Sequence, residues 1–146
     1  MPTPRFTVQL CAWRDAETSL RDIRTRIFIQ EQSVPEALEW DGEDAHAVHA
    51  LARDMDGQSI GTARLLLHAE LAHIGRMAVL PAWRKQGVGR ALLNAVMVAA
   101  QARGATQVFL NAQTSAVPFY AQAGFLVEGE QFLDAGIPHL RMTRSL

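Results

Sequence analysis

The sequence predicts a mixed α/β domain in which short strands and longer helices alternate around one sheet. Segments with period-two alternation of apolar and polar residues are separated by segments whose apolar residues recur every three or four positions. The 146 residues are 49% hydrophobic and 20% charged, an ordinary globular composition at about the length of one domain. No internal repeat or low-complexity linker divides the chain. We therefore expect one domain over residues 1–146.

Five short segments carry the pattern that is typical of strands. They are residues 6–10, 48–53, 59–67, 73–80 and 107–111. The three middle segments follow one another with short turns between them. They are therefore expected to form an antiparallel meander at the centre of the sheet.

Helical spacing appears in two longer segments, residues 16–31 and 91–103, and a short helix is expected to open at residues 113–116. Residues 32–45 are acidic and rich in turn residues, which predicts a long exposed connection. Within it, residues 41–44 (Asp-Gly-Glu-Asp) are expected to form a solvated acidic turn.

A glycine-containing loop joins the last strand of the meander to the second long helix. It reads Arg84, Lys85, Gln86, Gly87, Val88, Gly89, Arg90. The first turn of a helix has unpaired backbone N–H groups and partial positive charge, and glycines let an anion approach the backbone. The spacing matches neither a Walker loop nor the dinucleotide fingerprint. The loop predicts a phosphate site, and the other interpretation is a glycine-capped helix with a solvated basic face.

Two signatures in this order resemble those of the GNAT superfamily of acetyltransferases. The pattern Arg84-x-x-Gly87-x-Gly89 after a strand resembles its pyrophosphate-binding motif. The stretch from Gln113 to Phe119-Tyr120 and Gly124-Phe125 resembles its Asn-x-x-Ala-x-x-Phe-Tyr signature, with Gln113 in place of asparagine. The resemblance extends over residues 5–144.

A narrower resemblance is to the ElaA/YjcF-type branch of the superfamily. The residues that carry it are the segments 28–35, 41–44, 74–76 and 136–139. The resemblance implies a GNAT-like fold, with a central, mostly antiparallel, twisted sheet that is splayed at the acetyl-CoA site and flanked by about four helices.

The resemblance also implies an N-acetyltransferase that moves an acetyl group from acetyl-CoA to a primary amine of a small molecule. In this superfamily the amine attacks the thioester directly in a ternary complex, so no nucleophilic side chain is required. The implied cofactor-binding residues are Met77, Ala78, Val79, Arg84, Lys85, Gln86, Gly87, Val88, Gly89, Arg90, Gln113 and Tyr120.

Four side chains are candidates for catalysis or acceptor binding. Tyr120 can protonate the departing thiolate as a general acid, or it can simply pack the helix end. Glu31 can act as the general base, bind the acceptor cation or cap backbone. His139 can bind the acceptor or take its proton. Arg76 can bind an acidic group of the acceptor or pair with a carboxylate of the chain.

Charge and composition narrow the remaining functions. A net charge of −1 lacks the broad positive field that attracts nucleic acid or anionic lipid. No metal is expected. His46 and His49 come closest to the spacing of metal ligands, but on an extended strand residues three apart point to opposite faces. Residues 1–4 open no secretory signal, and the longest apolar stretch is shorter than the ~20 residues of a membrane span, so a cytoplasmic location is expected.

The acceptor and the assembly state stay open. The acidic residues Glu36, Glu39 and Asp41 favour a cationic acceptor. A homodimer is plausible, because the sheet has edge strands. The alternative function is a non-catalytic acyl-CoA sensor that regulates a partner.

Overall fold

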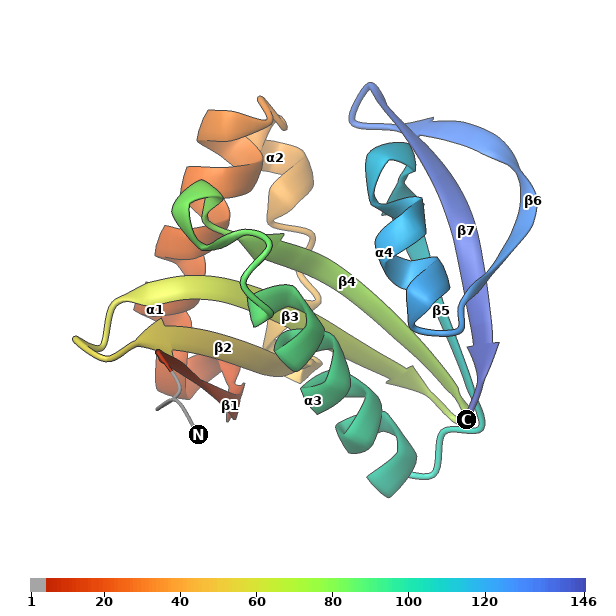
Figure 1. Cartoon of the computed structure of the whole chain (residues 1–146), viewed down its shortest axis with the longest axis horizontal. Helices are drawn as coiled ribbons and strands as arrows, with labels where there is room; N and C mark the ends of the chain where they lie inside the picture. Colours follow the sequence, from red (N-terminus) through yellow and green to blue (C-terminus); the bar gives the residue numbers. More distant parts are fainter. Residues whose placement is uncertain (1–4) are drawn as a thin grey trace.

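The computed structural model describes residues 5–146 (Figure 1). Residues 1–4, on which the expectation of no secretory signal rests, lie outside the described part. The seven strands are β1 (Phe6–Ala12), β2 (Val48–Asp54), β3 (Ser59–His68), β4 (Leu71–Val79), β5 (Gln107–Gln113), β6 (Leu126–Asp134) and β7 (Ile137–Ser145). The α-helices of residues 5–146 are α1 (Trp13–Arg24), α2 (Glu36–Glu39), α3 (Val88–Ala102) and α4 (Val117–Gln122). A π-helix, η1 (Thr25–Glu31), and the 3₁₀ turns η2 (Asp44–His46), η3 (Pro81–Trp83) and η4 (Thr114–Ala116) complete the described elements.

The strands form one sheet in the order β1-β2-β3-β4-β5-β7-β6. All neighbours are antiparallel except β4 and β5, which are parallel. The crossover between these parallel strands is α3, as a parallel connection requires. The mixed α/β, mostly antiparallel architecture expected from the sequence is confirmed.

Helices cover the two faces of the sheet. Figure 1 shows α3 and α4 in front of the sheet and α1 behind it. The main core fills the space between the sheet and α3, where Leu92, Leu93 and Val96 are almost completely buried. Gly61 on β3 lets α3 approach closely, because a Cβ at that position would lie 2.9 Å from Leu92 Cδ1 and 3.1 Å from the Ala78 carbonyl oxygen. This contact sets the start of α3 against the end of β4.

The strands β4 and β5 separate part of the way along their length. Their pairing covers only Leu71–Ile74 of β4 against Gln107–Leu110 of β5. β4 continues to Val79 and β5 continues to Gln113 without pairing each other. The expected splay of the sheet is therefore present, and the edge of β4 that faces β5 has no strand partner beyond Ile74.

A β-bulge in β4 accompanies this separation. Arg64 pairs with Gly75 and Thr62 pairs with Ala78, so Ala63 lies opposite two residues, Arg76 and Met77. Arg76 has a φ of 51°, an unusual value for a residue other than glycine. Such a bulge bends the strand and turns its groups away from the regular ladder.

Several element boundaries differ from the sequence-based prediction. The first helix begins at Trp13 and becomes a π-helix at Thr25, where a continuous helix over residues 16–31 was expected. The second long helix begins at Val88, three residues before the expected residue 91, because Gly87 in a left-handed conformation ends the loop there. The short helix begins after Gln113, which is the last residue of β5.

Candidate active site

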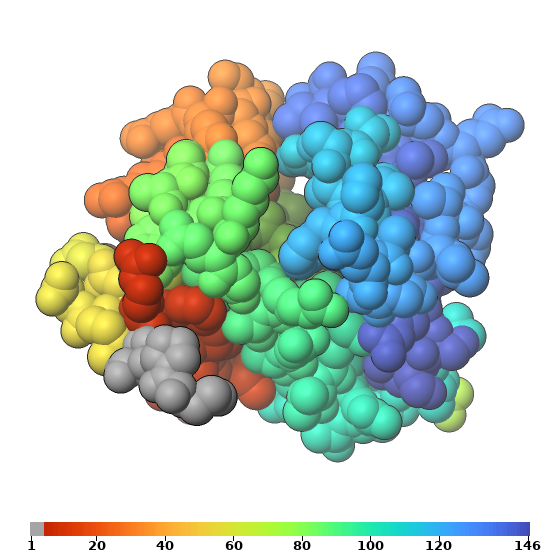
Figure 2. Space-filling model, viewed as in Figure 1, coloured from red at the N-terminus to blue at the C-terminus, as the bar shows by residue number. Residues whose placement is uncertain are grey.

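A cavity of about 480 Å³ lies where β4 and β5 separate. Figure 2 shows a hollow between the loop that precedes α3 and the segment of η4 and α4. The elements around the cavity are η1, α2, β4, β5, α4 and the turn between β6 and β7. Of the residues predicted for the site, Arg76, Met77, Ala78, Val79, Arg84, Gln113, Tyr120 and His139 line it.

The part of β4 that lines the cavity has an edge without a strand partner. Met77, Ala78 and Val79 line the cavity on the side that has lost β5 as a neighbour. Buried backbone N–H and C=O groups without a partner require one from a ligand or water. This edge therefore offers main-chain donors and acceptors to an extended, amide-containing ligand.

The loop before α3 presents the start of a long helix at one end of the cavity. Lys85 and Gly87 both have positive φ, 62° and 89°, and α3 begins at Val88. A Cβ built at Gly87 would meet nothing within 4 Å, so the space beside it is open. The N-terminal N–H groups of a fifteen-residue helix together with an open approach suit an anion.

The other predicted loop residues lie around this helix start. Gln86 donates to the Ala82 carbonyl and accepts from Arg5, and Val88 is buried in the core. Gly89 faces the ring of Phe119, which a Cβ there would approach to 3.4 Å. Arg90 lines a smaller neighbouring cavity of about 230 Å³ between α3 and α4.

Tyr120 lies on α4, with its side chain in the wall of the larger cavity. Its ring packs edge-on against Phe119 and Phe125, at centroid distances of 5.0 and 6.1 Å. Burial raises the pKa of the Tyr120 phenol well above its ordinary value. The hydroxyl therefore keeps its proton at all ordinary pH values and is an uncharged hydrogen-bond donor in the cavity wall.

Glu31 is bound to the predicted pyrophosphate loop. Arg84 donates from Nη1 and Nη2 to the two Glu31 oxygens at 2.8 and 2.6 Å, and its Nε donates to the Val79 carbonyl at 2.9 Å. The hydrogen bond from Arg84 lowers the pKa of Glu31, a carboxylate that burial would shift upward. Glu31 does not line the cavity itself, but its partner Arg84 does.

Two further predicted residues close the cavity on the β5 and β7 side. The Gln113 amide donates to Gln32 Oε1 at 2.9 Å, which joins the end of β5 to the chain after η1. His139 shares a 2.6 Å hydrogen bond between Nδ1 and the Ile137 carbonyl, and it stacks on Phe132. Both side chains are thus held in fixed orientations.

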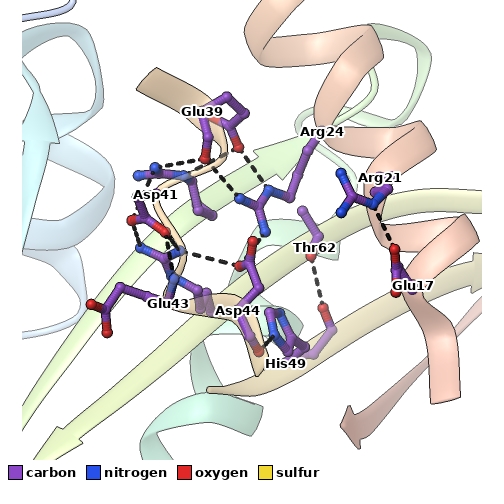
Figure 3. Close-up of polar contacts among 12 residues, drawn as sticks. Glu17, Arg21, Arg24, Glu39, Asp41, Glu43, Asp44, His49 and Thr62 are labelled. Atoms are coloured by element: carbon purple, nitrogen blue, oxygen red, sulfur yellow. Dashed lines mark hydrogen bonds and ion pairs between the residues drawn. The ribbon is translucent and has the colours of Figure 1, made fainter. Parts of the chain in front are cut away.

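Arg76 belongs to a cluster of three arginines and three carboxylates, part of which Figure 3 labels. Its members are Arg24, Arg64, Arg76, Glu39, Asp41 and Asp44. Arg76 donates to Glu39 Oε2 at 3.1 Å and to the Glu39 carbonyl at 3.0 Å. The side chain thus pairs with carboxylates of the chain while it lines the cavity.

The cluster corrects the expectation of a solvated acidic turn over residues 41–44. Asp44 is buried and accepts from Arg24 at 2.6 Å and from Arg64 at 3.2 Å. Asp41 accepts two hydrogen bonds from Arg64. These carboxylates are internal counterions, because buried guanidinium groups need charged partners.

Metal-binding groups and membrane-spanning helices were both looked for in residues 5–146. No group of three or more His, Cys, Asp and Glu side chains in this part of the chain is arranged to hold a metal ion. None of its helices is long and apolar enough to cross a membrane.

Comparison with known proteins shows which family the chain is similar to. The acetyltransferase (GNAT) domain family matches residues 15–146. The chain is 38% identical over 132 residues to the uncharacterized N-acetyltransferase YjcF of Bacillus subtilis, covering 88% of this chain and 94% of that protein.

Solved structures show the same fold. An acyl-CoA N-acyltransferase from Pseudomonas aeruginosa superposes with a TM-score of 0.85 at 32% identity, covering 95% of this chain and 99% of that one. Escherichia coli ElaA superposes with a TM-score of 0.85 at 27% identity and the same coverage of both chains.

Proposed function

The chain belongs to the acetyltransferase (GNAT) domain family and is therefore an acyltransferase, and from this premise we propose that it moves an acetyl group from acetyl-CoA to the primary amine of a small molecule. The observation that carries the proposal is the separation of β4 and β5 over a cavity that holds Tyr120. The cavity joins the unpaired edge of β4 and a proton donor in one space, and Arg84 in its lining leads into the loop before α3. Direct transfer between two bound substrates needs these three parts.

The residues present fit acetyl-CoA as the donor. The open space beside Gly87, with the N–H groups at the start of α3, suits its pyrophosphate, and Arg84, Lys85 and Arg90 supply positive charge nearby. The unpaired edge of β4 from Met77 to Val79 suits hydrogen bonds to the pantetheine amides. Gln113, at the end of β5, faces the same cavity from the other strand. When bound, acetyl-CoA supplies the thioester whose carbonyl carbon the amine attacks.

Tyr120 is the proposed general acid. As the new C–N bond forms and the C–S bond breaks, the sulfur leaves with the electron pair of that bond. Tyr120 gives its phenolic proton to that sulfur, so coenzyme A departs as the thiol, and the proton that the nitrogen loses as the amide forms returns to Tyr120. Burial raises the pKa of the phenol, so this proton is in place before acetyl-CoA binds.

The amine must lose its extra proton before it attacks. Glu31 is the proposed acceptor of that proton, either directly or through water. The pair with Arg84 makes Glu31 a weaker base, because the hydrogen bonds from Arg84 lower its pKa, so a change in Arg84 that loosens the pair strengthens this role. His139, which lines the cavity, is the second candidate for the same step.

The release of coenzyme A from acetyl-CoA tests this function. Polyamines, amino sugars, amino acids and short peptides are offered in turn, and Tyr120→Phe is compared with the unchanged protein. Turnover of one amine that falls sharply in Tyr120→Phe supports the transferase.

A non-catalytic acyl-CoA sensor is the alternative. It requires tight binding of acetyl-CoA without turnover of any amine, and binding unchanged by Tyr120→Phe. If acetyl-CoA does not bind at all, both functions are wrong.

A further inference from the structure

The half of the cavity away from α3 and α4 is bordered by an excess of guanidinium groups. On β5, the buried Val108, Leu110 and Ala112 belong to the core with α3, so the alternating Phe109 and Asn111 face the opposite side of the sheet. His73 on β4 stacks on Phe109, with ring centroids 4.3 Å apart, and therefore shares that side. His73 and Asn111 both line the cavity.

Three of the carboxylates near this face are already paired with arginines. Glu39, Asp41 and Asp44 are matched one for one by the three arginines of the cluster in Figure 3. Of the three acidic residues behind the expected cationic acceptor, Glu39 and Asp41 are thus paired within the chain, and Glu36 is exposed on α2.

Arg141 on β7 adds a positive charge that the cluster does not balance. Its guanidinium carbon lies 4.1 Å from the centre of the Phe109 ring, which places it on the same side of the sheet. Arg141 does not line the cavity itself, but its register neighbour on β5, Asn111, does. Its neighbour on β6 is Glu128, and within residues 5–146 no ion pair joins Arg141 to a carboxylate. Its Nε is buried and has no hydrogen-bond partner in that part of the chain.

A second unused donor lies close to the same space. Arg64 lines the cavity, its side chain is 3% exposed, and its Nε is likewise buried without a partner among the described residues. Buried polar groups without partners are uncommon and indicate a missing ligand or water. The two guanidinium groups thus present unused hydrogen-bonding capacity beside the cavity.

The pKa of His73 is lowered by burial and by the positive charges around it. Burial, followed by the charges of Arg64, Arg141 and Arg76, lowers the pKa of His73 to about 4. All three arginines are therefore close enough to act on one cavity-lining side chain.

We propose that the acceptor carries a carboxylate beside its amine, and that Arg141, at the edge of the cavity beside Asn111, binds this carboxylate together with Arg64. This inference rests on the proposed acetyl transfer and names the class of its acceptor: an amino acid or a related small amino carboxylate. Asp134, at the end of β6, lines the same cavity and can meet the ammonium group as it enters. An acceptor with both charges therefore complements the cavity better than a polyamine does.

Matched ligands test the inference without requiring turnover. N-acetyl amino acids, which are the products it implies, are titrated calorimetrically into the full chain with coenzyme A present, each beside its uncharged carboxamide. At least one acid should bind about 10- to 100-fold more tightly than its amide, the range expected for a hydrogen-bonded charge. If no acid in the panel binds more tightly than its amide, the inference is wrong.

Variants of Arg141 separate recognition from folding. Arg141→Leu should remove the preference for the acid, Arg141→Lys should restore part of it, and Arg14→Leu, an exposed arginine at the start of α1, should leave it unchanged. If Arg141→Leu fails to fold, the charge-preserving Arg141→Lys supplies the result: it should keep a preference for the acid but a weaker one, because lysine cannot form the two-point contact.

The acetyl-transfer assay tests the proposed class of acceptor separately from the proposed acetyl transfer. Amino acids should have a lower KM than the corresponding amines that lack the carboxylate, such as tryptophan against tryptamine. If only amines without a carboxylate turn over, the proposed acetyl transfer stands and the anionic acceptor is wrong. If acetyl-CoA itself does not bind, the proposed function is wrong.

Discussion

Glu31 and Arg84 form a two-point ion pair that joins the end of η1 to the loop before α3. The N···O distances are 2.8 and 2.6 Å, and both side chains are partly exposed. Glu31, the proposed base, and Arg84, which is proposed to bind the pyrophosphate, are therefore bound to each other before substrates bind. Binding of an anion at Arg84 would release Glu31 toward the acceptor.

Glu31→Gln tests this competition. We expect kcat to fall by about 10²-fold if Glu31 takes the amine proton. We also expect acetyl-CoA to bind up to roughly fivefold more tightly, because Arg84 no longer has to leave an ion pair worth at most about 1 kcal/mol. Glu36→Gln, at an exposed carboxylate on α2, is the control. Unchanged affinity for acetyl-CoA would show that the two groups do not compete.

Tyr120→Phe removes only a hydroxyl and keeps the ring contacts with Phe119 and Phe125. We expect kcat to fall by about 10²- to 10³-fold with little change in acetyl-CoA affinity, as for loss of a general acid. Because burial raises the Tyr120 pKa, the unchanged enzyme should show no alkaline loss of activity from this group up to about pH 10. Steady-state kinetics across pH measure both quantities, and a fully active variant would assign protonation to water.

Local pattern predicted the parts of the fold that local residues determine. Period-two alternation marked most strands, and the glycines at residues 87 and 89 marked the start of α3. The strand β6 was not predicted, because all of its residues are exposed and no buried face imposes alternation on the sequence. The bulge at Arg76 also left no local signal, since residue 76 is not a glycine although its φ is positive.

The ion cluster was missed because its partners are distant in sequence. Glu39 lies 15 residues from Arg24 and 37 from Arg76. Composition alone makes the acidic segment look solvated, and only the fold shows that it covers buried arginines. One signal was available: Arg24 lies on the apolar face of the helix with Leu20 and Ile27, where an arginine is rarely buried unless it is paired.

Arg24→Met should destabilise the protein strongly. Arg24 is completely buried and binds Glu39 at 2.7 Å and Asp44 at 2.6 Å, so its loss leaves each buried carboxylate with one arginine fewer and the cluster with one unbalanced negative charge. The free energy of unfolding should fall by about 3–5 kcal/mol in denaturant titrations. Arg26→Met breaks only an exposed pair with Asp22 and should cost less than about 1 kcal/mol. Similar losses in the two variants would contradict a structural role for the cluster.

The same cluster should make stability fall in acid. Burial alone would raise the pKa of Asp41, but hydrogen bonds from Arg64 and the Glu43 backbone, with the charges of Arg64 and Arg76, lower it to about 2. A lowered folded-state pKa gives stability that is fully present above the unfolded pKa of about 4 and is lost as pH falls toward 2. Asp41 is partly exposed, so its share should be roughly 1–2 kcal/mol rather than the full value of the shift.

Asp41→Asn measures that share. Urea unfolding at pH 7 and at about pH 2.5 should show a smaller acid loss in Asp41→Asn than in the unchanged protein, while Asp56→Asn in the exposed β2–β3 turn should behave like the unchanged protein. Equal acid losses in all three proteins would mean that Asp41 does not hold its lowered pKa in the folded state.

Gly87→Ala tests whether the conformation of the loop before α3 is needed for acetyl-CoA binding and not only for stability. Gly87 has a φ of 89° and open space beside it, so the methyl group strains the backbone without a steric clash. Gly57, in the β2–β3 turn, has a φ of 82° and equally open space, which makes Gly57→Ala a matched control. Both variants should lose about 1–2 kcal/mol of stability. Only Gly87→Ala should weaken acetyl-CoA binding in calorimetric titrations, because relief of its strain moves the N–H groups that lead into α3. Equal affinities in the two variants would place the pyrophosphate elsewhere.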